Sequence, residues 1–92
     1  MSKLPYIIKV ATASSRDAVA GAIAGLVRDH QHAEIRAVGA HAVTKATEAI
    51  VIATDFLAQE GIAIVFVPRF VTFDLDGEDR HAILFVIDLG PQ

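Results

Sequence analysis

The sequence predicts an α/β fold (α+β, two-layer) with two helices on one face of a four-stranded mixed sheet. Segments rich in β-branched and aromatic residues alternate with two segments whose apolar residues recur at helical spacing. The resulting order is β-α-β-α-β-β, and right-handed strand–helix–strand connections place both helices on the same side of the sheet. A length of 92 residues fits a single domain over residues 1–92.

The first strand is expected over residues 6–11, where β-branched and aromatic side chains suit a pleated sheet. A helix is expected over residues 15–29, with Ser14 as its N-cap. Its predicted core stripe is Val19, Ala22, Ile23, Leu26 and Val27. Gly21 and Gly25 lie inside this helix, where each costs roughly 1 kcal/mol relative to alanine. We therefore expect the neighbouring helix to approach closely at these glycines.

The second strand is expected over residues 34–38, and the second helix over residues 40–59, ended by Gly61. The core stripe predicted for this helix is Val43, Ala46, Ile50, Ala53 and Leu57. Val51 and Ile52 fall on or beside its polar stripe, where packing within one chain does not require them. Two adjacent bulky apolar residues there are a modest indication of a contact surface.

The last two strands are expected over residues 62–73 and 80–89, joined by a hairpin turn at Asp76-Gly77. Pro68 marks an edge, a bulge or a bend, because proline cannot donate to a strand ladder. Both strands are apolar on both faces, whereas a sheet face in water normally carries polar residues. We therefore expect a second chain to cover the face that the helices leave bare, giving a homodimer or homotetramer.

Composition excludes several classes of site. The chain has no cysteine, which excludes disulfides, thiolate metal sites and a cysteine nucleophile. No apolar run reaches the roughly 20 residues of a membrane helix, and the start lacks the features of a signal peptide. We expect a soluble, cytoplasmic protein without a cofactor or a membrane partner. The net charge of −3 means that nucleic-acid binding would need a local basic patch.

Motifs for catalysis and for metal binding fail. The glycines at 21 and 25 lack a following Lys-Ser or Lys-Thr, which excludes a phosphate-binding loop of the usual kind. The acidic run at 74–79 places its glycine too early for a calcium loop and is typical of a solvated hairpin tip. Ser14 and Ser15 are better explained as helix-start residues than as nucleophiles. We expect no enzymatic activity and no catalytic or metal-binding residues.

The remaining candidates are basic or polar residues near the helix starts. Helix starts carry partial positive charge and free amides, which suits phosphates, and both starts lie at the same end of this sheet. The candidate nucleic-acid contacts are Lys9, Ser14, Ser15, Arg16 and Lys45, with Arg36 as a weaker candidate. The alternative is ordinary surface charge, because eight basic residues in 92 sometimes group by chance.

Four segments, at residues 9–15, 19–25, 33–40 and 76–80, closely resemble the stage V sporulation protein S family. The resemblance extends from about residue 8 to residue 87. It implies an Alba-like fold with the same element order and a regulatory role in endospore development and coat assembly. It also implies nucleic-acid binding, by analogy with Alba proteins.

Two functional hypotheses follow. The first is a dimeric or tetrameric regulator that binds DNA or RNA through phosphates, largely independently of sequence. The second is a protein-interaction or oligomerisation module that acts in assembly without nucleic acid. Under the first hypothesis the acidic hairpin is expected to be repelled by phosphates, unlike the basic arms of Alba proteins. A small-ligand or enzymatic role ranks last, because no catalytic set is visible.

Overall fold

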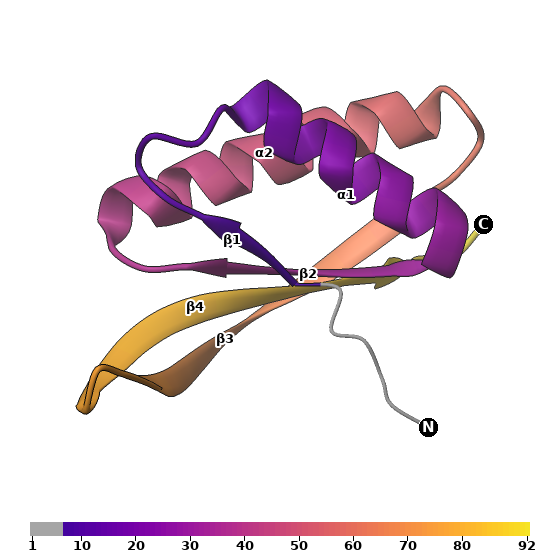
Figure 1. Ribbon diagram of the computed structural model, residues 1–92. Helices are drawn as coiled ribbons and strands as arrows, with labels where there is room; N and C mark the ends of the chain where they lie inside the picture. The colour runs from indigo at the N-terminus through magenta and orange to yellow at the C-terminus, as the bar shows by residue number, and fades with distance from the viewer. Residues whose placement is uncertain (1–6) are drawn as a thin grey trace.

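The computed structural model describes residues 7–92, and its elements follow the expected order. They are β1 (Ile7–Val10), α1 (Arg16–His30), β2 (His32–Ala37), α2 (Ala40–Ala58), β3 (Ile64–Leu75) and β4 (Glu78–Leu89). Both helices lie on one side of the sheet (Figure 1). The two-layer α/β prediction is therefore confirmed. Tyr6, where the first strand was expected to begin, lies outside the described residues.

The sheet has four strands in the order β1-β2-β4-β3. β1 runs parallel to β2, while β4 is antiparallel to both β2 and β3. The last strand along the chain therefore inserts between β2 and β3, which leaves β3 at an edge. The β3–β4 hairpin is longer than the other strands and projects beyond the helices (Figure 1).

The core lies between the helices and the strands β1, β2 and β4, and the helices contact β1 and β2 most. The largest fully buried side chains are Ile23, Ile35, Ile50, Leu57, Ile87 and Val27. The stripe predicted for α2 is confirmed as core or core-packing. On α1 the prediction was wrong for Ala22, which is exposed, whereas Ala20 and Ala24 are buried. The buried face of α1 is thus rotated toward Ala20 and Ala24, because small side chains fit where the two helices approach.

The N-cap of α1 is Ser15, one residue after the serine predicted from the sequence. The Ser15 backbone is extended, and its side-chain oxygen accepts a hydrogen bond from the Ala18 amide at 3.2 Å. The Ser14 hydroxyl instead accepts from the Ala11 amide at 2.9 Å and so closes the loop between β1 and α1. The physical reason is backbone conformation, since the capping residue is the last extended residue before the helix.

The helical glycines of α1 do not mark a close approach, so that expectation was wrong within one chain. A Cβ built on Gly21 or on Gly25 meets no atom within 4 Å outside the local helix backbone. Both positions therefore have open space around them. Within one chain, packing gives no reason for glycine at these positions.

The hairpin turn and the edge proline agree with the sequence. Asp76 and Gly77 have φ values of 53° and 82°, as a type I′ turn requires at its two central positions. Pro68 lies in the edge strand β3, where its missing donor leaves the ladder with β4 intact.

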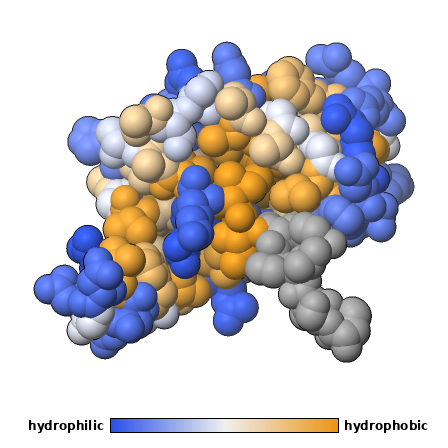
Figure 2. All heavy atoms as spheres, in the orientation of Figure 1, coloured by the Kyte–Doolittle hydropathy of each residue, from blue (hydrophilic) through white to orange (hydrophobic). Residues whose placement is uncertain are grey.

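Apolar surface remains exposed on the edge strand β3 and on helix α2. Phe70 on β3 is 87% exposed, Val67 is 56% exposed, and Val51 on α2 is 57% exposed. Ile52 differs from the prediction, since it is partly buried against the core. In Figure 2 apolar residues gather beneath the helices, while the hairpin tip is hydrophilic. None of the described helices is long and apolar enough to cross a lipid bilayer.

Candidate nucleic-acid interface

The six predicted contact residues separate into two surfaces. The first, called the helix rim, comprises the residues near the starts of α1 and α2: Ser14, Ser15, Arg16 and Lys45. The second, called the open face, is the side of the sheet that points away from the helices, and it carries Lys9 and Arg36. These two residues are register partners on β1 and β2, and they point away from the core that the alternate residues fill. The structure therefore does not bring all six residues together.

The two helix starts do meet at one end of the sheet, as predicted. The Lys45 ammonium on α2 donates a hydrogen bond to the Thr12 carbonyl in the β1–α1 loop at 2.7 Å. The N-cap of α2 is Gly39, which has no side chain to cap the helix, and no acidic residue lies in the first turn. The free amides at this helix start therefore have no side-chain cap from residue 39, and no first-turn carboxylate offsets their partial positive charge.

Charge on the helix rim is already partly compensated. The Arg16 guanidinium lies 2.8 Å from the Glu48 carboxylate, and the two side chains are 55% and 45% exposed. Glu48 was not among the predicted site residues, because it is 32 positions away in sequence. The Ser14 and Ser15 oxygens already accept backbone hydrogen bonds. The rim therefore offers an incoming phosphate less attraction than the sequence suggested.

The open face is organised in rows that cross the strands. One row runs from Lys9 through Arg36 and Leu84 to Arg69, each residue being the register partner of the next. Register partners in adjacent strands point to the same side of the sheet, so these side chains share the open face. Arg69 was not among the predicted contact residues. The sequence does show that Arg69 points to the opposite side of its strand from Pro68 and Phe70.

Arg36 is held from one side by an aromatic ring. Its guanidinium carbon lies 4.1 Å from the centre of the Phe73 ring, on the same face of the sheet. Both side chains are half-buried. A cation placed over an aromatic face is attracted by the ring quadrupole. This contact restrains the Arg36 side chain and keeps its charge, because aromatic rings do not neutralise a cation.

His32 stands at the other end of the open face between two carboxylates. Its Nδ1 lies 2.7 Å from Asp88 Oδ1 on β4, and its Nε2 lies 2.9 Å from Glu34 Oε2 on β2. Only the doubly protonated ring donates to both carboxylates. These hydrogen bonds, to Asp88 first and then to Glu34, raise the pKa of His32 above its ordinary value of 6.5.

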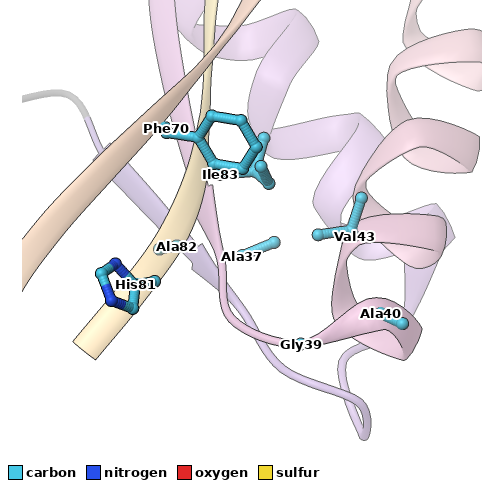
Figure 3. A pocket seen from close by; sticks show the side chains of 8 residues that line it. All are labelled: Ala37, Gly39, Ala40, Val43, Phe70, His81, Ala82 and Ile83. Carbon is cyan, nitrogen blue, oxygen red and sulfur yellow. The ribbon is translucent and has the colours of Figure 1, made fainter.

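A shallow apolar hollow lies beside this surface, between the start of α2 and the sheet. Its volume is about 240 Å³, and its walls are Ala37, Gly39, Ala40, Val43, Phe70, His81, Ala82 and Ile83. In Figure 3 the side chains of Phe70, Ile83 and Val43 approach the hollow, whereas the His81 ring points away from Val43. Residues 7–92 contain no cluster of three or more side chains suited to a metal ion. The lining gives no nucleophile with an adjacent base.

Comparison with known protein families identifies the family of the chain. The family model described as stage V sporulation protein S (SpoVS) matches residues 6–89, which is most of the chain. The matched region includes all six helices and strands and both surfaces described above. On this extent of match, the chain belongs to the stage V sporulation protein S family.

Proposed function

We propose that this SpoVS-family sporulation protein is a non-enzymatic cytoplasmic regulator that binds DNA or RNA through the phosphate backbone. The observation that carries the proposal is that Lys9 and Arg36 lie side by side, as register partners on β1 and β2, on a sheet face that no helix covers. Neither residue forms a side-chain ion pair with a carboxylate among the interactions of residues 7–92. Their charges therefore remain available to phosphates.

The helix rim supplies the weaker part of the proposed interface. Ser14 and Ser15 present hydroxyl groups, and Lys45 lies beside the uncapped start of α2. Arg16 must loosen its contact with Glu48 before it binds a phosphate fully. Such contacts position a backbone and carry no base information, so binding is expected to be salt-sensitive and largely independent of sequence.

The experiment compares the two surfaces by fluorescence anisotropy with short labelled DNA and RNA at low and moderate salt. The Lys9→Ala/Arg36→Ala double variant is expected to lose more affinity than the Arg16→Ala/Lys45→Ala double variant. Each double variant removes two positive charges, so the pair is matched in net charge. Absence of binding by the unaltered protein at low salt would remove the proposal.

The second candidate function is a protein-interaction or oligomerisation module that acts in assembly without nucleic acid. Exposed apolar side chains favour it, above all Phe70 and Phe66 on the helix-facing side of β3, and the Phe66 ring lies 5.7 Å from that of the core residue Phe85. We call these residues, together with Val43 and Ile83, the overhang surface. A second copy of the chain would cover it in a homodimer or homotetramer. The most exposed large apolar side chain, Phe70, lies on this surface and not on the open face, where the sequence alone suggested the contact.

A further inference from the structure

The open face carries more than the pair on which the proposed function depends. We infer that single-stranded nucleic acid is the class of partner, and that it lies across the sheet over Lys9, Arg36 and Arg69. This inference rests on the proposed function and adds to it a route, a further contact residue and a choice of strand state. Nucleotide bases pack on the apolar side chains between and beside these three cations.

The geometry of the cationic row supplies the first argument. Lys9, Arg36 and Arg69 occupy a single row on β1, β2 and β3, with Leu84 of β4 between the two arginines. Neighbouring strands lie about 4.8 Å apart, so the row spans roughly 14 Å across the sheet. A linear array of cations matches a linear polyanion better than it matches a single small anion.

The position of the acidic residues supplies the second argument. The carboxylates of the open face are Glu34, in the row beside Arg36, Asp88 one row further on, and Glu78 beside the hairpin turn, and the first two are bound to His32. The row of Lys9, Arg36 and Arg69 and the row that follows it toward the hairpin contain no carboxylate. These two rows therefore carry three positive charges and no carboxylate, although the whole chain has a net charge of −3.

The apolar residues beside the row decide between a single strand and a duplex. The adjacent row contains Val86 and Val67 next to Glu34, and Val67 is 56% exposed. A duplex hides the faces of its bases and would leave these side chains in contact with water or with phosphates. A single strand can turn its bases toward the sheet and bury them there, as single-strand-binding proteins do on aromatic and apolar platforms.

The Arg36–Phe73 contact adds a stacking element to the same surface. Bases stack on aromatic rings and on arginine guanidinium planes in single-strand recognition. Here the guanidinium of Arg36 already lies over the Phe73 ring. The Arg36 side chain is therefore partly ordered in the free protein, and it loses less conformational entropy when the partner binds.

The test uses a fluorescein-labelled oligothymidylate and a DNA hairpin duplex of similar length, each titrated by anisotropy over a salt series. Arg69→Ala is expected to weaken binding of the single strand several-fold and to lower its salt slope by roughly 0.7, as for one lost phosphate contact. The control is Arg28→Ala, which removes the same charge at the far end of α1, where Arg28 is paired with Glu60 and not with the open face. The control is expected to leave the salt slope unchanged.

A second measurement uses the unaltered protein and does not depend on any variant folding. Oligothymidylate is expected to shift the NMR methyl signals of Val67, Leu84 and Val86 on the open face. The Val51 methyls serve as the control, because Val51 is equally exposed but lies on α2. Comparable shifts at Val51 and at Val67 would contradict the assigned route.

The outcomes separate this inference from the proposed function. Absence of binding to both DNA probes, and to the labelled RNA of the first experiment, removes the inference and the proposed function together. Binding that is insensitive to Arg69→Ala, with unmoved Val67 methyls, overturns the inference and leaves the proposed function in place. Tighter binding of the duplex than of the oligothymidylate, through the same residues, overturns the choice of a single strand.

Discussion

His32 illustrates how a single side chain can tie sheet stability to pH. The ring bridges β2 and β4 through Glu34 and Asp88, and these carboxylates raise its pKa above 6.5. A group whose pKa is raised on folding contributes stability that is fully present below the unfolded pKa. That contribution is lost as the pH rises through the folded pKa.

We predict that the free energy of unfolding attributable to His32 declines between about pH 6.5 and the raised folded pKa. His32→Gln should flatten this part of the pH profile, because a neutral amide cannot bind the additional proton. Urea unfolding at several pH values between about 5 and 8 measures the effect. His41→Gln, on the exposed first turn of α2, is the control. The same dependence of unfolding free energy on pH in the unaltered protein and in His32→Gln would contradict a stabilising role for the His32 contacts with Glu34 and Asp88.

The two adjacent serines before α1 show what residue types alone do not decide. Sequence favours either serine as a helix cap, and only the backbone conformation identifies Ser15 as the residue that binds the Ala18 amide. Ser15→Ala is expected to reduce the free energy of unfolding by about 1 kcal/mol. Ser14→Ala should cost less, because its hydrogen bond closes an exposed loop. Chemical denaturation compares them, and the reverse ranking would contradict the assignment of the cap.

At the scale of the element, helix α1 keeps two glycines without a steric need within one chain. Gly21→Ala and Gly25→Ala place a methyl group in open space. Each is expected to stabilise the protein by roughly 0.5 to 1 kcal/mol, because alanine loses less backbone entropy than glycine in a helix. Thermal unfolding at fixed protein concentration measures the gain. A loss of stability that depends on protein concentration would instead indicate another chain packed against α1.

The helices and strands were largely predictable from the sequence, whereas the order of the strands in the sheet was only partly predictable. Asp76-Gly77 fixes the β3–β4 register, because a two-residue turn leaves one pairing, and that pairing sets Arg69 opposite Leu84. The insertion of β4 beside β2 depends on contacts between distant segments. The row that joins Arg69 to Arg36 follows from that insertion, and so it was not predicted. The carboxylate of Glu48 beside Arg16 escaped prediction for the same reason.

At the scale of the whole molecule, the helices cover only part of the sheet and leave the overhang surface in water. Phe70→Ser is expected to lower the oligomeric state of the protein, because Phe70 is the most exposed large apolar residue of this surface. Light scattering after size-exclusion chromatography at micromolar concentration measures the change. Val67→Ser is the control on the opposite side of the same strand. Dissociation by Val67→Ser alone would place the second chain on the open face instead.

The proline in the edge strand bears on how the protein avoids fibril formation. β3 is a long strand with one unpaired edge, the kind of template on which further strands add. At Pro68 this edge offers no amide to an incoming strand, and the next residue, Arg69, repels an identical copy stacked in register. Pro68→Val would restore a continuous hydrogen-bonding edge beside Phe66 and Val67. Thioflavin fluorescence of the variant should then rise on prolonged incubation, while that of the unaltered protein should not increase.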